Sequence, residues 1–451
     1  MPLTKVSYSM IQGEVVNVLD YGAYNNGTNA SATTAAFAAA LATGNTVFIP
    51  EGTFLINGAL QLQDGQKVFG AGSKATVINC DQTSFSGIFF SMGGYTSISH
   101  LSLVGVNGTN ATGIKCWDSA DQYGFTGYIK LRDVNISGMR YGLFVNNIFF
   151  LDYQIGVLQD NIRGINIVPA YSVSQDSGYV TTLTFYKLDL LSNDYGVYCE
   201  STIRSKNIMF RDCAIEINTD SHQGYFQNCD PLTFENCYFE GSSSVFALQI
   251  VSSETFIQQC YFNGTGGIQL GSGSNSLRVN RIYGTTANDK IIGTGTILQD
   301  VHVYNSQLGA NCNFGMSKLR LYSTTVGATS YKDFGRNLGP TISSSAPGTN
   351  TTVLNEVTAY TKTVSATINA GATTALISDQ AASNIWADNF TTAVASISNA
   401  YAPGLILTVT PATTGNANYF CVLATNTTAS PITLTSAALK VSFISGAGMA
   451  I

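Results

Sequence analysis

Charged side chains are scarce in this chain of 451 residues, where Asp, Glu, Lys and Arg together make up 11%. An average soluble domain has about 25%. The net charge of −6 and the absence of a long basic run exclude a surface for the phosphate backbone of a nucleic acid. No stretch approaches the ~20 apolar residues needed to cross a bilayer, so we expect no membrane insertion. No Ser/His/Asp order and no glycine-rich phosphate loop stands out.

The nine cysteines form no Cys-X-X-Cys pair and no Cys/His spacing typical of a metal site. We therefore predict neither a metal nor a cofactor. Buried cysteines serve as small apolar fillers, and free thiols indicate synthesis in a reducing compartment. The N-terminal segment MPLTKVSYSMIQG has no apolar core of the kind found in signal peptides. These features predict a protein made in the cytoplasm without an export signal.

A repeat is the strongest positive signal in the sequence. The segments MFRDCAIEIN, TFENCYFEGS and FIQQCYFNGT align on Cys213, Cys237 and Cys260, in steps of 24 and 23 residues. Such a period indicates one strand-bearing unit stacked on the next. Apolar and polar residues alternate within each unit, which is typical of strands. We expect Cys213, Ile215 and Ile217 to point inward, and Ala214, Glu216 and Asn218 to point outward.

A stacked coil of this kind is a right-handed parallel β-helix, and we predict it for residues 14–335. The alanine-rich stretch NNGTNASATTAAFAAALATG favours one short helix near its start. Ser31 could cap this helix and Gly44 could end it. A helix in this place would cover the apolar end of the first turn, which would otherwise invite edge pairing. The fold class is therefore all-β with an N-terminal capping helix.

Residues 3–80 carry a specific resemblance. The order VNVLDYGA, an alanine-rich helix, TVFIPEGTF and KVFGAGSKATVI closely resembles the start of the pectate-lyase-like β-helix domain of bacteriophage tailspikes. The opening LTKVSYSMI also looks like the leader of phage tail proteins. The Asp clusters and Arg of calcium-dependent pectate lyases are missing. The resemblance implies the pectin-lyase-like fold, a homotrimer and a place in the virion tail after synthesis in the host cytoplasm.

Three further segments complete the predicted organisation. Residues 1–13 form an arm that we expect to dock onto another phage tail or baseplate protein. Residues 336–352 have the Ser, Gly and Pro content of a linker. Residues 353–451 contain five charged residues and alternate at turn spacings suited to a small β-sandwich. We read this sandwich as a trimerisation domain, with a sugar-binding module as the alternative.

Carboxylates on the outside of the coil are the candidate catalytic groups. Alignment on the cysteines gives two outward columns, the first with Asp189, Ala214, Tyr238 and Tyr261 and the second with Leu191, Glu216, Glu240 and Asn263. Adjacent turns lie ~4.8 Å apart, and positions two apart on a strand ~6.8 Å. Glu216 and Glu240 would stack at about 5 Å, and Asp189 and Glu216 would lie about 8 Å apart on the diagonal. Glycosidases retain configuration at the first separation and invert it at the second.

The residues around these acids suggest a sugar site. Tyr238 and Tyr261 would form an aromatic strip for sugar rings, with Asn263 beside it. Arg211 and His222 complete the predicted substrate-binding set. Alternatives are a purely solvated role for the acids, packing against another subunit, or an acid supplied by one of the long insertions or by another subunit. The insertion acids are Asp118, Asp121, Asp152, Asp160, Asp176, Asp194 and Glu200.

The function that these features predict is recognition and endo-hydrolysis of a bacterial surface polysaccharide, either capsule or O-antigen. Glu216 or Glu240 would act as the acid, and the other carboxylate or Asp189 as the base or nucleophile. A polysaccharide lyase is the second chemical option, for which Arg204, Lys206 and Arg211 could neutralise a uronate. The alternative class is a non-catalytic receptor-binding adhesin or structural tail fibre. A secreted bacterial pectinase fits poorly with the missing signal peptide and the free thiols.

Overall fold

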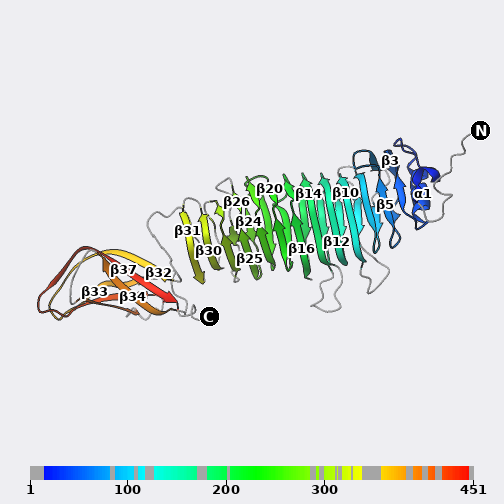
Figure 1. The fold of residues 1–451 in the computed structure, drawn as a ribbon. Helices are drawn as coiled ribbons and strands as arrows, with labels where there is room; N and C mark the ends of the chain where they lie inside the picture. The colour runs from blue at the N-terminus through cyan, green and yellow to red at the C-terminus, as the bar shows by residue number, and fades with distance from the viewer. Residues whose placement is uncertain are drawn as a thin grey trace, which may run out of the picture.

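The structure is a computed structural model, and it is dominated by a long column of stacked strands (Figure 1). It describes residues 15–81, 87–105, 110–116, 126–169, 180–200, 204–284, 291–293, 299–309, 312, 317–326, 329–337, 357–381, 390–398, 405–411 and 419–445. The predicted N-terminal arm, residues 1–13, lies outside this set. So does nearly all of the predicted linker, although strand β31 (Thr329–Asn337) continues into its first two residues.

One large sheet forms two rows of parallel strands along the column. The first row contains β1 (Val16–Asn17), β2 (Val47–Ile49), β5 (Lys67–Gly70), β8 (Ser97–Val104), β10 (Thr126–Ser137), β12 (Ile148–Gln159), β14 (Val180–Leu191), β16 (Ser205–Arg211), β19 (Leu232–Glu235), β22 (Glu254–Gln258), β25 (Asn275–Asn280), β28 (Gln299–Tyr304) and β30 (Ser317–Val326). The second contains β3 (Gly52–Ile56), β6 (Thr76–Cys80), β17 (Ala214–Glu216), β20 (Tyr238–Glu240), β23 (Tyr261–Asn263), β26 (Tyr283–Gly284) and β29 (Gln307–Leu308). The longer strands β8, β10, β12, β14 and β30 take part in both rows.

A second sheet of ten strands, which we call sheet B, forms another wall of the coil. Its strands are β4 (Leu60–Gln61), β7 (Ile88–Met92), β9 (Thr112–Cys116), β11 (Tyr141–Val145), β13 (Arg163–Ile167), β15 (Tyr195–Cys199), β18 (His222–Gln227), β21 (Phe246–Val251), β24 (Ile268–Leu270) and β27 (Ile291–Gly293). All pairings between neighbouring turns are parallel until β31, which pairs antiparallel with β30. The predicted parallel β-helix is therefore confirmed.

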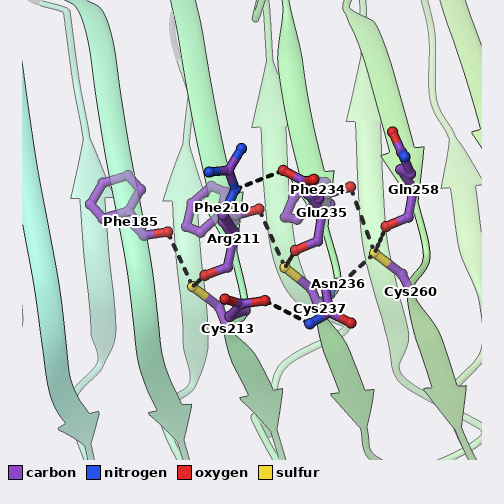
Figure 2. Close-up of polar contacts among 11 residues, drawn as sticks. Phe185, Phe210, Arg211, Cys213, Phe234, Glu235, Asn236, Cys237, Gln258 and Cys260 are labelled. Carbon is purple, nitrogen blue, oxygen red and sulfur yellow. Dashed lines mark hydrogen bonds and ion pairs between the residues drawn. The ribbon is translucent and has the colours of Figure 1, made fainter.

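The three cysteines stack as the repeat predicts. Cys213, Cys237 and Cys260 are at most 2% exposed. Their sulfur atoms form a column in which each contacts a backbone carbonyl of the preceding turn, at 3.4–3.7 Å (Figure 2). A hydrogen bond with the Cys237 thiol, together with burial, raises the pKa of Cys213. The Cys213 thiol therefore stays protonated, and the three cysteine side chains fill the corner between two strands.

Aromatic rings continue the stacking inside the coil. Phe185, Phe210 and Phe234 lie on successive turns, with ring centroids 4.7 Å and 5.1 Å apart. Each such pair contributes about 0.5–1.5 kcal/mol beyond the burial of its surface. Identical residues at one position of successive turns thus hold the turns in register.

The predicted inward alternation is wrong at its last two positions. Ile217 is 54% exposed, whereas Asn218 is 2% exposed. Ile217 adopts a left-handed backbone conformation with φ of 52°, so the chain leaves the strand after Glu216 and the period of two ends there. This turn places Asn218 inside the coil. Its side chain accepts hydrogen bonds from the backbone N–H and the side-chain amide of Asn193, at 2.9 Å and 3.1 Å.

Asn161 repeats this arrangement one turn earlier, since it donates in the same two ways to Asn193 Oδ1. Asn193 in turn donates to the carbonyl of Leu158 at 2.9 Å. The three asparagines form a buried ladder in which every amide satisfies the backbone of a neighbouring turn. Because buried polar groups without partners are costly, the ladder fixes this corner of the coil.

We expect Asn193→Ala to destabilise the coil, because the backbone N–H of Asn161 and the carbonyl of Leu158 would lose the hydrogen bonds that they make with this side chain. Leaving one such group unsatisfied costs about 1–3 kcal/mol. Thermal unfolding followed by circular dichroism should show a lower midpoint. The matched control is Gln258→Ala, which removes an exposed amide from β22. Equal midpoints for the two variants would contradict the role of the ladder.

Helix α1 (Ala30–Leu41) lies at the N-terminal end of the column (Figure 1). It buries Phe37 against Phe54 with an edge-on ring contact of 5.5 Å, and so covers the apolar end of the coil as predicted. The predicted cap is wrong, because Asn29 occupies the N-cap position and Ser31 lies in the first turn of the helix. Gly44 follows the helix with φ of 70°, and its N–H donates to the carbonyl of Leu41.

The C-terminal strands form two antiparallel sheets of three strands each. One consists of β32 (Val357–Ile368), β37 (Ile432–Ser445) and β34 (Phe390–Ser398), and the other of β33 (Thr373–Ala381), β36 (Tyr419–Asn426) and β35 (Leu405–Pro411). Two such sheets suit the predicted sandwich, whose boundaries and assembly role stay predictions. No helix in the described part of the chain is long and apolar enough to cross a membrane.

Candidate functional site

The two predicted outward columns are in register on β14, β17, β20 and β23. Asp189 pairs with Ala214, Ala214 with Tyr238, and Tyr238 with Tyr261. In the second column Leu191, Glu216, Glu240 and Asn263 follow one another in the same way. The first column runs on from Tyr261 to Tyr283 and Gln307. The acids and tyrosines predicted from the repeat therefore share one face of the coil.

Glu216 is the acid of this set whose pKa is raised both by burial and by neighbouring charges. Partial burial raises its pKa, and the negative charges of Asp189 and Glu240 raise it further. Burial also raises the pKa of Asp189. Oδ1 of Asp189 is buried and has no hydrogen-bond partner among the described residues. Two carboxyl groups with raised pKa values thus lie on the same face of the coil, and one of them has a buried oxygen that no described residue satisfies.

A short hydrogen-bonded chain holds Glu240. The Tyr238 hydroxyl donates to Glu240 Oε2 at 2.7 Å, and the Asn263 amide donates to the same hydroxyl at 3.0 Å. These contacts fix the position of the Glu240 carboxylate, whose negative charge raises the pKa of Glu216.

Ala214 leaves a gap in the first column. The rings of Tyr238 and Tyr261 are stacked along the coil, with centroids 5.6 Å apart and planes 8° apart. One face of Tyr238 is thus covered by Tyr261, and the other is turned toward the small side chain of Ala214. Asp189 stands on the far side of this gap, two strand spacings or about 10 Å from Tyr238. We call this space, bounded by Asp189, Ala214, Glu216 and Tyr238, the Ala214 notch.

Arg211 is not part of this cluster. It lies at the end of β16, before the corner that leads to β17, and its Nε donates to Glu235 at 2.7 Å (Figure 2). A shallow groove of about 470 Å³ lies at this corner, lined by Arg211, Asp212, Glu235, Asn236, Gln259, Arg281 and Tyr283. Tyr283 links this groove to the column of tyrosines. The groove could therefore hold a continuation of a chain that is bound along Tyr238 and Tyr261.

His222 also lies apart from the carboxylates, on β18 of sheet B. Its Nε2 is 2.7 Å from Gln269 Oε1, and its Nδ1 is 2.8 Å from the Ser221 hydroxyl. Burial lowers the pKa of His222, so the ring is neutral at pH 7. The structure therefore brings Asp189, Glu216, Glu240, Tyr238, Tyr261 and Asn263 together, and leaves Arg211 and His222 elsewhere on the coil.

Sequence reasoning missed the outer face of sheet B. Its strands TGIKC, YGLFV, RGINI and YGVYC share a glycine at the second position and an outward side chain at the first and fourth. A Cβ on Gly142 or Gly164 would meet the carbonyl of the next turn at 2.7 Å, so only glycine fits this close approach. The glycine that recurs at the second position of these strands is the sequence feature from which this face could have been predicted. It marks a face that carries Tyr141, Phe144, Arg163, Tyr195 and Tyr198.

In the part of the chain that the structure describes, no three His, Cys, Asp or Glu side chains are grouped so that they could hold a metal ion. The insertion acids Asp118, Asp121 and Asp176 lie outside that part.

The fold resembles those of several solved structures. A protein of Geobacillus virus E2, ORF18, is 16% identical, with a TM-score of 0.52 over 91% of this chain and 76% of its own. The Azotobacter vinelandii mannuronan C-5 epimerase AlgE4 A-module is 16% identical, with a TM-score of 0.44 over 71% of this chain and 99% of its own. Tailspike gp49 of Acinetobacter baumannii bacteriophage Fri1, a capsular polysaccharide depolymerase, is 12% identical, with a TM-score of 0.44 over 96% of this chain and 87% of its own.

A search among curated protein sequences found no match. The profile of a protein family, rhamnogalacturonase A/epimerase, pectate lyase-like, matches residues 15–241. This match covers half of the chain and includes β14, β17 and β20, which carry the three candidate acids. The resemblance predicted from residues 3–80 is thereby confirmed at the level of family and fold. The chain belongs to the rhamnogalacturonase A/epimerase, pectate lyase-like family.

Proposed function

We propose that this protein is a phage tailspike that binds a bacterial surface polysaccharide and cleaves it by hydrolysis. The observation that carries the proposal is the alignment of Asp189, Glu216 and Glu240 beside the free face of Tyr238. Paired carboxyls are the groups that glycoside hydrolysis requires, and an aromatic ring face is a surface against which a sugar ring can lie. The virion setting rests on the tailspike-like order of residues 3–80 and on a fold shared with a viral protein.

The Ala214 notch suggests how the acids divide their roles. A sugar ring against the free face of Tyr238 would lie between Asp189 and Glu216. Glu216, whose pKa is raised, would donate its proton to the glycosidic oxygen. Asp189 would activate the attacking water, and the diagonal separation of about 8 Å suits inversion of configuration. Glu240 would raise the pKa of Glu216 through its charge.

The test is a screen of the purified protein against capsule and O-antigen polysaccharides. Size-exclusion chromatography reports chain length, and ultraviolet absorbance reports the unsaturated uronide that a lyase would leave. Shortened chains without that absorbance support hydrolysis. Shortened chains with it would assign a lyase, and binding without shortening would assign an adhesin. We also propose that the protein acts as a homotrimer attached through residues 1–13, which light scattering and a truncated variant would test.

The pH dependence of cleavage should follow the two perturbed acids. We expect kcat/KM to fall as the pH drops through the raised pKa of Asp189, because the base becomes protonated. It should fall again as the pH rises through the raised pKa of Glu216, because the acid loses its proton. Both limbs should lie above the ordinary carboxyl values of about 3.9–4.3.

The variant Glu240→Gln provides a sharper test, because it removes a charge that raises the pKa of Glu216. The alkaline limb should move to lower pH, while the acidic limb stays in place. An unmoved alkaline limb would contradict the electrostatic role of Glu240. A loss of activity at every pH would instead make Glu240 the nucleophile of a retaining enzyme.

A further inference from the structure

Asp189 has no hydrogen-bonding neighbour on either side of it in the first column. Val157 is paired with it on the preceding turn, and Ala214 on the following turn. Neither of these side chains can donate a hydrogen bond, and Oδ1 of Asp189 is buried without a partner among the described residues. Buried polar atoms are satisfied in the great majority of cases, so this oxygen points to a functional reason. Ala214 leaves the notch open on one side of Asp189, whereas Val157 lies on the other side.

The turn behind Val157 holds this residue in place. Its backbone N–H donates to Oδ1 of Asn135 on β10 at 3.0 Å. The buried hydroxyl of Tyr153 donates to the carbonyl of Val134 at 2.7 Å. A Cβ on Gly156 would lie 2.3 Å from the oxygen of that carbonyl and 2.8 Å from the hydroxyl, so the residue before Val157 has to be glycine. The side chain of Val157 therefore has a fixed position in the column.

The charged groups around Asp189 lie on β14, β16 and β17. On β17 it is Glu216, on the diagonal. On β16 it is Arg211, which is paired with a glutamate of β19. On β14 itself it is Lys187, whose Nζ lies over a neighbouring tyrosine ring, 5.1 Å from its centroid. On β12 the next outward residue is the uncharged Gln159. Burial, rather than a neighbouring charge, raises the pKa of Asp189.

We propose that Val157 is a positioning residue that keeps Asp189 basic, because it withholds hydrogen bonds and water from the carboxylate on the side away from the notch. The inference rests on the proposed function, since it concerns the base of that reaction. Hydrogen bonds stabilise the charged form of a carboxylate, so a carboxylate that accepts few of them is the stronger base. The lone pairs of Asp189 are thus left for the proton of the attacking water, which reaches them from the notch.

The test is Val157→Thr, which keeps the shape of the side chain and adds a hydroxyl donor. This hydroxyl can donate to Asp189 across the ~4.8 Å between turns, so the pKa of Asp189 should fall by roughly one pH unit. NMR of the full-length protein with aspartate labelled at the carboxyl carbon reports this pKa, and Asp189→Asn identifies the signal. The acidic limb of kcat/KM should move to lower pH by the same amount. We expect kcat to fall by roughly 3-fold to 10-fold, because the base is weaker.

Three further variants make the result specific. Val157→Ile keeps the position apolar and should leave the pKa of Asp189 and the pH profile as in the wild type. Val157→Asn offers an amide donor and should act in the same direction as Val157→Thr. Val104→Thr makes the matched change on β8, three turns before Asp189, and should have no effect on either measurement. Equal melting temperatures would show that the variants are folded.

Two results would overturn the proposal: an unchanged pKa of Asp189 in Val157→Thr and Val157→Asn, or an equal fall in Val157→Ile. If this pKa fell as expected but the wild type shortened no polysaccharide in the screen, the proposed hydrolysis would be wrong and the role of Val157 would stand. If the wild type shortened a polysaccharide and Val157→Thr had the same acidic limb, hydrolysis would stand and the role of Val157 would be wrong.

Discussion

Glu216→Gln should reduce polysaccharide cleavage by about 10²–10⁴-fold, the usual contribution of a general acid. Glutamine has nearly the same shape as glutamate but cannot donate the carboxyl proton to the leaving oxygen. Glu216 is the candidate acid whose pKa is raised by burial and by two neighbouring carboxylates. The measurement is the rate at which chain length falls, followed by size-exclusion chromatography or by new reducing ends.

The control for this variant is Glu254→Gln, which removes an exposed glutamate from β22 outside the candidate site. It should cleave like the wild type. Glu216→Gln should still bind the polysaccharide, because the tyrosine column and Asp189 are unchanged. If Glu216→Gln cleaved at the wild-type rate, the assignment of the acid would be wrong, although the fold and the binding face could stand.

The repeat was sufficient to predict the register of this face. Once Cys213, Cys237 and Cys260 are aligned, the strand period of two residues determines which side chains face outward on β17, β20 and β23. The structure agrees for Glu216 and Tyr238, because these strands are regular and each turn copies the preceding one. The alternation failed at Ile217, where a left-handed residue turns the chain. A local backbone conformation of this kind leaves no trace in a pattern of apolar residues.

The placement of Arg211 and His222 could not be predicted in the same way. Both lie close in sequence to Glu216, but each is separated from it by a corner of the coil. Two residues that are close in sequence but on either side of a corner therefore face different directions. Two residues that are 23 or 24 positions apart, in contrast, stack on neighbouring turns. Sheet B went unrecognised for a different reason. Its outward positions are three residues apart, so Tyr195 and Tyr198 do not follow a simple alternation.

Ala214→Tyr should abolish cleavage while leaving the coil intact, and it tests the notch directly. The column already holds tyrosines at the next three turns, so a tyrosine at residue 214 fits the same backbone and can stack on Tyr238. Such a pair contributes about 0.5–1.5 kcal/mol, so thermal stability should be unchanged or slightly higher. The new ring would occupy the space between Asp189 and Tyr238. Displacing a substrate even by about 1 Å can cost 10²-fold in rate, and we expect at least that loss.

Two variants make this result specific to the notch. Ala214→Ser keeps the side chain small and should cleave like the wild type. Gln307→Tyr extends the same column beyond Tyr283, several turns from the acids, and should also have no effect on cleavage. If Ala214→Tyr were as active as Gln307→Tyr, the sugar would not enter between Asp189 and Tyr238. The direct stack of Glu216 on Glu240 would then be the better candidate for the catalytic pair, because it does not require the notch.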